Sequence, residues 1–297
     1  MNTTRIAELL HPFLRALPGS LALRNSRPTT NRAPAHFHLE PAKAGEAYPQ
    51  PDPKPALDPP KGEPAVLSPT QLQNISTYID ILIRRNARIN LTAIRDPEDI
   101  VTRHFGESLF AASHLFPVPA SVSPVSSVVK ALDSTIDVDG DRKEASAPAN
   151  VVNESLSVSG HSTLADIGSG AGFPGLPIKL WAPQISLTLV ESNHKKAAFL
   201  REITRALTLT DVNIQNARAE TLITNTFNVV TLRAVERFES ILPTAAALVA
   251  PAGRLALLIG ASQQDQAETR LSAFTWSEPI PIPHSRNRVL LVGEPNS

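Results

Sequence analysis

The 297-residue sequence contains no cysteine, which excludes disulfide bonds, thiolate zinc sites and cysteine nucleophiles. It has no apolar run long enough to cross a membrane, and its N-terminus lacks the apolar core of a signal peptide. Neither sign of charge is in excess, because 28 Lys and Arg balance 28 Asp and Glu. This neutrality argues against nucleic-acid binding by bulk charge alone, although it leaves room for a local basic patch. The sequence therefore predicts a soluble, cytoplasmic protein.

Two segments have a composition unlike that of a folded core. Seven prolines fall within sixteen residues at 49–64, and proline lacks a backbone donor, so 19–66 is predicted to be a disordered linker. Residues 117–160 are rich in Ser, Val, Ala and Asp without sustained periodicity. We expect them to form a low-complexity insertion that buries too little surface to offset its ordering entropy.

The stretch between these segments, 67–116, is predicted to be helical. Ser68-Pro69-Thr70-Gln71 is a capping box with proline at the first helical position, and apolar residues follow it at helical spacing. A second helix is expected to begin at Asp96, with acidic residues at the positive end of its dipole. The sequence RRNARINLTAIRD, residues 84–96, is predicted to be the loop between the two helices.

From residue 162 onward, strand and helix patterns alternate, which predicts an α/β domain over 161–297. The expected strands lie near 162–167, 186–190, 212–216, 227–232, 254–259 and 288–292. The expected helices lie near 173–181, 193–207, 236–249 and 262–273. Such repeats form a mainly parallel sheet with helices on both faces, and ligands bind beyond the carboxyl ends of its strands.

Residues 164–175 read LADIGSGAGFPG and combine two overlapping ligand-binding patterns. Gly170, Gly172 and Gly175 spell the dinucleotide fingerprint G-x-G-x-x-G. Asp166, Gly168, Gly170 and Gly172 spell D-x-G-x-G-x-G, the form that S-adenosylmethionine sites take. A tight turn without a ligand is a third reading.

Asp166 favours S-adenosylmethionine over NAD. A carboxylate at the end of the strand repels a pyrophosphate but suits the positive amino and sulfonium groups of the methyl donor. The dinucleotide pattern would also place Pro174 in its phosphate turn. Glu191 ends the next strand, where an acidic side chain accepts hydrogen bonds from ribose hydroxyls. Glu191 supports a ribose in either cofactor and does not choose between them.

Five segments together carry a resemblance to a known family. They are RINLTAIRDPEDIVTRHFGESL at 88–109, LADIGSGAGFPGLPIKLWAP at 164–183, LVESNHKKAAFLREITRALTL at 189–209, NARAE at 216–220 and VVTLRAV at 229–235. This combination resembles the bacterial small-subunit ribosomal RNA methyltransferase G family, also called glucose-inhibited division protein B. The resemblance implies a class I, Rossmann-like S-adenosylmethionine-dependent methyltransferase with a small helical N-terminal part, in which 1–18 match the first helix. It implies methylation of N7 of a guanine in 16S ribosomal RNA.

The resemblance also implies roles for individual residues. Gly168 and Phe173 match positions that line the cofactor, and Ala219 and Glu220 match the pair beside its adenine. With the residues of the loop itself, the expected cofactor-binding set is Gly168, Phe173, Ala219, Glu220, Arg233, Asp166, Gly170, Gly172 and Glu191. The expected substrate-positioning residues are Arg218, Arg233, Arg103 and His104. An ion pair between Arg218 and Glu220, and a packed structural role for His104, are the competing interpretations.

Two short motifs of the sequence depart from the family pattern. Arg85-Asn86-Ala87 replaces the usual Trp-Asn-Lys, and Ile259 stands where the family has a lysine before a glycine. The second change removes one charge that would contact RNA. Lys195, Lys196, Arg201 and Arg205 follow Glu191 on one predicted helix and form either an RNA-facing stripe or a solvated face.

The chemistry implied by the family requires no general base. Guanine N7 carries an in-plane lone pair and no hydrogen, so it can attack a sulfonium methyl directly once the two are aligned. We see no metal-ligand cluster. The predicted partner is 16S ribosomal RNA or the small ribosomal subunit, the protein is expected to be monomeric, and no membrane is involved. Methylation of another RNA or protein, an NAD-dependent oxidoreductase and a non-catalytic ribosome-assembly factor remain as alternatives.

Overall fold

The computed structural model describes residues 1–14, 66–117, 162–234 and 238–296. The predicted linker 19–66 and insertion 117–160 lie outside this part of the chain except for their last and first residue, respectively. Within the described ranges, no helix is long and apolar enough to cross a membrane.

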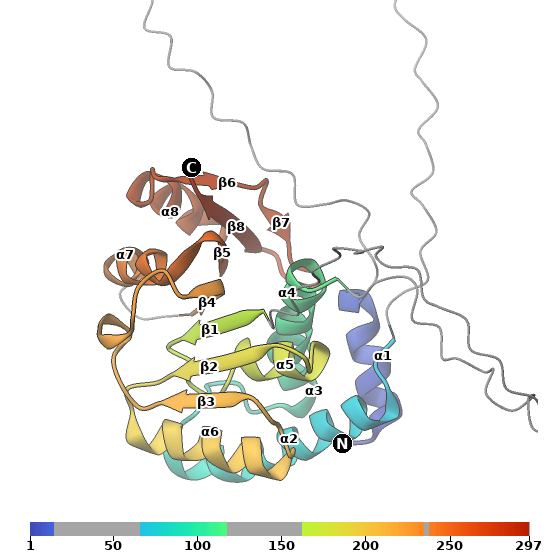
Figure 1. The fold of residues 1–297 in the computed structure, drawn as a ribbon. Coiled ribbons are helices and arrows are strands. Elements are labelled where there is room, and N and C mark those ends of the chain that lie inside the picture. Colours follow the sequence, from blue (N-terminus) through green and yellow to red (C-terminus); the bar gives the residue numbers. More distant parts are fainter. Residues whose placement is uncertain (15–65, 118–161, 235–237, 297) are drawn as a thin grey trace, which may run out of the picture.

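The centre of the molecule is an eight-stranded sheet in the order β3-β2-β1-β4-β5-β8-β6, with β7 paired to β8 (Figure 1). Strands β1 to β5 are parallel, whereas β6, β7 and β8 pair in antiparallel fashion. The strands are β1 Thr163–Ile167, β2 Ser186–Val190, β3 Val212–Gln215, β4 Phe227–Arg233, β5 Val249–Gly260, β6 Phe274–Trp276, β7 Ile280–Pro281 and β8 Arg288–Pro295. The predicted mainly parallel sheet is thus confirmed, and β6 and β7 are additions too short to give a periodic pattern.

Helices cover both faces of the sheet, because alternate residues of each strand point to opposite sides. Leu164, Leu187 and Leu189 pack on one face with α1 Thr3–Leu14, α2 Pro69–Ile89, α4 Glu107–Leu115, α5 Gly175–Trp181 and α6 His194–Ala206. Ala165 and Ile167 pack on the other face with α7 Phe238–Leu248 and α8 Gln264–Arg270. The predicted helical N-terminal part therefore shares one hydrophobic core with the sheet (Figure 1).

Helix α2 begins as the capping box predicts and ends later than expected. Gln71 N donates to Ser68 Oγ at 3.2 Å, and Ser68 N donates to Gln71 Oε1 at 2.8 Å. The helix continues to Ile89, so the predicted loop 84–96 is wrong over its first half. Nothing in Arg-Arg-Asn-Ala-Arg-Ile interrupts a helix, and the chain leaves it only at Asn90, in the left-handed conformation with φ 49°.

The second predicted helix begins at Asp96 as expected but is not a uniform α-helix. The Asp96 carboxylate accepts hydrogen bonds from the backbone N–H groups of Glu98 and Asp99. The chain then forms α3 Pro97–Asp99, the π-helix η1 Ile100–Gly106 and α4. The adjacent residues His104 and Phe105 are both buried in this π-helix.

Helix α1 packs against η1. The structure confirms a helix within the first eighteen residues, with Ile6, Leu10 and Phe13 fully or almost fully buried. Phe13 lies over Gly106, where an added Cβ would come within 2.6 Å of the phenyl ring. The absence of a side chain at Gly106 therefore allows the close approach of α1.

The Gly106→Ala substitution tests this packing through the sign of its effect. Within a helix, replacing Gly by Ala normally stabilises by up to about 1 kcal/mol. Here the new methyl group must displace Phe13, and overpacking of this kind costs about 1–3 kcal/mol. We expect a lower free energy of unfolding in chemical denaturation. A more stable variant would mean that α1 does not pack on Gly106.

Candidate functional site

The glycine loop after β1 has a left-handed backbone at its glycines and contacts helix α2. Gly168, Gly170 and Gly172 have positive φ values of 69°, 57° and 92°. A side chain at Gly172 would also overlap the hydroxyl of Tyr78 and the side chain of Leu176. Tyr78 donates its hydroxyl hydrogen to the carbonyl of Ala171. The loop is thus held from the side of the N-terminal helices, and Gly168 remains exposed.

Asp166 lies beneath the loop and not at its surface. Its fully buried carboxylate accepts hydrogen bonds from Gly175 N at 3.2 Å and Thr231 Oγ1 at 2.9 Å. Burial raises the pKa of Asp166 from its ordinary value of 3.8 to about 6, against the lowering effect of these hydrogen bonds. Asp166 therefore joins the end of β1 to α5 and to β4, and its direct contact with a cofactor stays a prediction.

Glu191 meets the glycine loop at the carboxyl end of β2. Its Oε2 atom accepts a hydrogen bond from Gly170 N at 2.9 Å, and its Oε1 atom accepts one from Asn193 N at 2.7 Å. Only 7% of its surface is exposed. The structure thus places the predicted ribose-binding acid directly against the predicted cofactor loop.

The N-terminus of α5 offers no free backbone donor to a phosphate. Gly175 N donates to Asp166, and Leu176 N donates to the carbonyl of Gly172 at 2.8 Å. Pro177 has no N–H group. Since dinucleotide sites hold the pyrophosphate at this helix end, the arrangement disfavours NAD.

Phe173 joins the loop to the helical part through stacked rings. Its ring stacks on His104 with centroids 4.6 Å apart and on Tyr78 with centroids 5.4 Å apart. Phe105 meets it edge-on at 5.1 Å. With 6% of its surface exposed, Phe173 mainly fills the core, and its predicted contact with the cofactor is left as a prediction.

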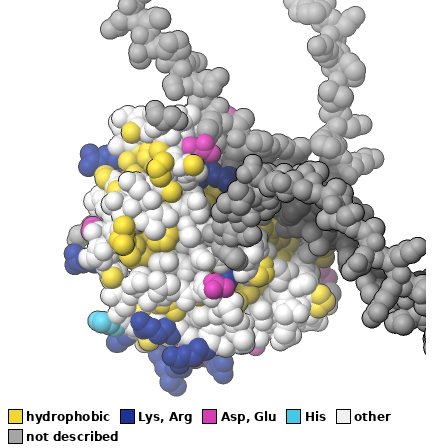
Figure 2. Space-filling view, viewed as in Figure 1, with side chains coloured by type: hydrophobic (Ala, Val, Ile, Leu, Met, Phe, Trp, Pro, Cys, Tyr) yellow, Lys and Arg dark blue, Asp and Glu magenta, His cyan; other side chains and the backbone are white. Residues whose placement is uncertain are grey.

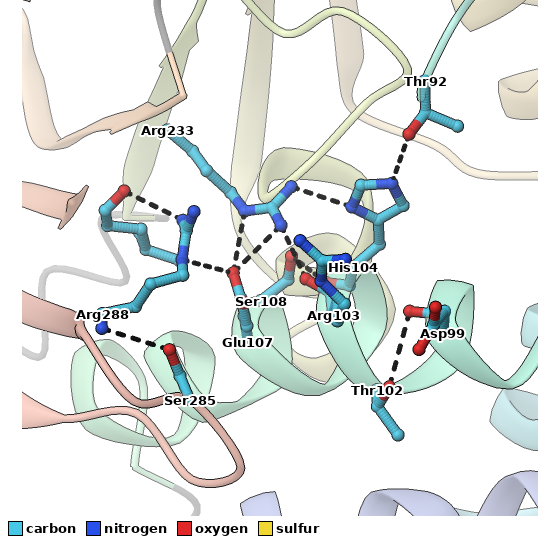
Figure 3. A network of polar contacts seen from close by, with 11 residues as sticks. Thr92, Asp99, Thr102, Arg103, His104, Glu107, Ser108, Arg233, Ser285 and Arg288 are labelled. Carbon is cyan, nitrogen blue, oxygen red and sulfur yellow. Dashed lines mark hydrogen bonds and ion pairs between the residues drawn. The ribbon is translucent and has the colours of Figure 1, made fainter. Parts of the chain in front are cut away.

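A polar network joins the helical part to the end of β4 (Figure 3). Arg233 Nη1 lies 3.1 Å from His104 Nδ1, and His104 Nε2 lies 2.8 Å from Thr92 Oγ1. Because a guanidinium only donates, Nδ1 is the acceptor and Nε2 carries the proton. Burial, with the nearby charges of Arg233, Arg103 and Arg288, lowers the pKa of His104 to about 3. His104 is therefore neutral, and the choice between a substrate-positioning and a packed structural role stays a prediction.

Arg233 is almost saturated by this network. Its Nε and Nη2 atoms donate to Glu107 Oε2 at 3.3 and 3.0 Å, and Nη2 also donates to the carbonyl of Arg103 at 2.6 Å. With the contact to His104, four contacts leave about one of the five N–H groups of a guanidinium. In this arrangement Arg233 has no pair of free N–H groups with which to bind a phosphate in bidentate fashion. Its role at the mouth of the site stays a prediction.

Glu107 and Arg288 are members of the site that the sequence analysis did not single out. Arg288 Nε lies 3.1 Å from Glu107 Oε2, the oxygen that Arg233 also contacts, and Arg288 Nη2 donates to the carbonyl of Leu258 (Figure 3). The Arg288 Nε contact is an ion pair without hydrogen-bond geometry. Glu107 lies in segment 88–109, which carries part of the family resemblance, whereas no sequence signal marked Arg288.

The other predicted site residues lie around this edge of the sheet. Arg103 and Arg218 are exposed, and within the described chain no carboxylate forms an ion pair with either guanidinium, so the proposed Arg218–Glu220 pair is absent. Ala219 is buried and Glu220 is exposed in the 3₁₀ turn η2 Ala219–Thr221. Ile259, at the position of the family lysine, is buried in the core beneath α7. The described residues include no group of three metal-ligating side chains.

His104 and Asp166 should make opposite contributions to the pH dependence of stability. An unfolded histidine titrates near 6.5, so the contribution of His104 is lost as the pH falls from about 6.5 toward 3. Asp166 binds its proton more tightly in the folded state, so its contribution is lost as the pH rises from 3.8 through about 6.

Asp166→Asn should leave only the histidine slope. The free energy of unfolding should then fall more steeply on acidification from about pH 6 to 4, by up to about 1.4 kcal/mol per pH unit. His104→Gln should change the slope in the opposite direction. Urea denaturation across this range measures both, and parallel profiles for the wild type and the two variants would contradict the assigned titrations.

The comparisons with known proteins agree on one family. The family model described as rRNA small subunit methyltransferase G matches residues 71–119 and 149–287. A protein of this name from Chloroflexus aggregans is 33% identical over 76% of this chain and 82% of its own length. The protein of this name from Bacillus subtilis is 28% identical over 76% of this chain and 83% of its own.

Solved structures to which part of the chain is similar include an S-adenosylmethionine-dependent methyltransferase from Aquifex aeolicus, with 13% identity and a TM-score of 0.39 over 44% of this chain and 81% of that one. A predicted O-methyltransferase from Agrobacterium tumefaciens has 21% identity and a TM-score of 0.40 over 46% of this chain and 74% of that one. On the evidence of the family model and the relatives, the chain belongs to the ribosomal RNA small subunit methyltransferase G family.

Proposed function

We propose that the protein transfers a methyl group from S-adenosylmethionine to N7 of a guanine in 16S ribosomal RNA, with Gly168, Gly170, Gly172 and Glu191 holding the cofactor. The observation that carries this proposal is the hydrogen bond from Gly170 N to the Glu191 carboxylate. This bond holds Glu191, an acid suited to ribose hydroxyls, against the glycine loop. The backbone of the loop is exposed at Gly168, where no side chain blocks a ligand. We place the enzyme in the cytoplasm, as a monomer acting on the small ribosomal subunit or its RNA.

The residues present fit the methyl donor better than a dinucleotide. Glu191 offers carboxylate oxygens to a ribose, and Ala219 and Glu220 stand at the positions that the family uses beside the adenine. The first N–H groups of α5 are already hydrogen-bonded, so this helix end has no donor for a pyrophosphate. The Asp166 carboxylate at the same helix end would repel it. When bound, S-adenosylmethionine supplies an electrophilic methyl group on its sulfonium.

The chain needs to align the guanine and does not need to deprotonate it. N7 presents its lone pair without a hydrogen, so the missing general base is consistent with the reaction. His104 fits this account, since its Nδ1 accepts from Arg233 and its pKa of about 3 keeps it neutral at physiological pH. We assign His104 to positioning Arg233.

The arginines divide into two kinds. Arg103 and Arg218 are exposed and free to donate a fork of N–H groups to a phosphate or to guanine O6. Arg233 is held by Glu107 and contributes mainly a fixed positive charge at the end of β4. We therefore propose that Arg103 and Arg218 bind the RNA, and that Arg233 holds the elements of the site together.

Gly168→Asp should abolish binding of S-adenosylhomocysteine. The new side chain strains a backbone with a φ of 69°, and it places bulk and a negative charge where the cofactor is proposed to lie. Calorimetric titration measures the loss. Gly168→Asn is the matched control for bulk without charge and should retain more affinity than the aspartate variant. Wild-type affinity in Gly168→Asp would show that the cofactor lies elsewhere.

The reaction itself is tested by incubating the protein with 16S ribosomal RNA or small subunits and S-adenosylmethionine. Mass spectrometry of the digested RNA should show one guanosine that gains a methyl group at N7. Arg218→Ala should lower kcat/KM by at least about tenfold while leaving S-adenosylhomocysteine affinity unchanged, because its role is confined to the RNA.

Two of the alternative functions predict other results. Methylation of another RNA or protein alone would assign another substrate. Binding of 16S RNA without cofactor binding would indicate an assembly factor. The one residue that favours this alternative is Ile259, which stands where the family has a lysine.

A further inference from the structure

Positive side chains gather where helices α2 and α6 lie side by side (Figures 1 and 2). Arg85 of α2 and Glu202 of α6 form an ion pair between the helices, with Nε and Oε2 2.8 Å apart. Around it lie exposed cations from both helices, which we call the α2–α6 basic surface. Its members are Arg84, Arg88, Lys195, Arg201 and Arg205.

The two helices are strongly positive in a chain that is neutral overall. Helix α2 carries three arginines against one aspartate, and α6 carries four Lys or Arg against one glutamate. The glutamate is paired with Arg85, and the aspartate, Asp80, lies 3.6 Å from the N-terminal amine. No carboxylate of the described residues forms an ion pair with a member of the basic surface.

Exposed cations of α6 form a row that runs from Lys195 in its first turn to Arg201 and Arg205 near its end. Arg201 and Arg205 are four residues apart, so they lie on one line of an α-helix. Ala197, Leu200 and Ile203 occupy the buried side. With a rise of 1.5 Å per residue, the row from Lys195 to Arg205 extends for roughly 15 Å, long enough to meet several phosphates of a nucleic-acid strand.

This row begins beside the proposed methyl-transfer site. Asn193 caps α6 through hydrogen bonds to Lys195 N and Lys196 N, and Asn193 N donates to the Glu191 carboxylate. The positive surface therefore starts at the carboxyl edge of the sheet, next to Glu191, and leads away from it. An RNA whose guanine enters the site has charged surface along which its backbone can continue.

We propose that the α2–α6 basic surface binds the phosphate backbone of the RNA substrate outside the site of methyl transfer. This inference rests on the proposed function for the identity of the RNA. Exposed, unpaired arginines that converge from two helices fit a polyanion, because each phosphate contact releases a counterion. The surface supplies affinity without reading sequence, and the choice of guanine remains with the site itself.

Arg205→Glu tests the surface, with Arg270→Glu as the matched control. Both arginines are exposed and lie in the last turn of their helices, so both variants lose the same favourable interaction with the helix dipole. Helix α8, which carries Arg270, covers the opposite face of the sheet. Filter binding of a 16S ribosomal RNA transcript is measured over a range of salt concentrations, together with the affinity for S-adenosylhomocysteine.

We expect Arg205→Glu to weaken RNA binding about tenfold at 0.1 M salt and to reduce the slope of log K against log salt by roughly one. Arg270→Glu should change neither quantity, and both variants should keep wild-type affinity for S-adenosylhomocysteine. Unchanged RNA binding in Arg205→Glu, or equal losses in the two variants, would overturn the inference. A wild-type protein that binds the RNA but not S-adenosylhomocysteine would defeat the proposed function and leave the basic surface standing.

Discussion

The buried contact between Glu107 and Arg233 is the interaction on which the arrangement of the site depends. It joins the first turn of α4 to the end of β4, with 5% and 8% of the two side chains exposed. Removing one partner from such a pair costs about 3–5 kcal/mol, since the other charge stays buried and uncompensated. Through His104 and Phe173, the same contact fixes the glycine loop relative to the helical part. The N-terminal helices therefore form one side of the candidate site.

Two carboxylates hold the glycine loop, one from β1 and one from β2. Asp166 holds the first N–H of α5 from below, and Glu191 holds Gly170 N from the neighbouring strand. Both acids come from strand ends at the same edge of the sheet, as parallel strands require. The loop is thus organised in advance by the chain's own groups, which reduces the entropy cost of the cofactor binding that we propose there.

Local patterns were enough to predict much of this structure. The capping box at Ser68 and the strand before Gly168 follow from residues close in sequence, and both are where the sequence placed them. The partners of Glu107 could not be predicted in this way, because Arg233 and Arg288 reach it from distant segments that meet only in the folded chain. The sequence predicted a helix from Asp96 but not its π-helical part η1, since a π-helix departs from the 3.6-residue repeat.

The most direct test of the central claim is a calorimetric titration of the purified protein with S-adenosylhomocysteine and, separately, with NAD. The closed N-terminus of α5 and the position of Glu191 predict binding of S-adenosylhomocysteine and none of NAD. Binding of NAD alone would contradict the account, because it would require a phosphate site at a helix end where the structure leaves no donor.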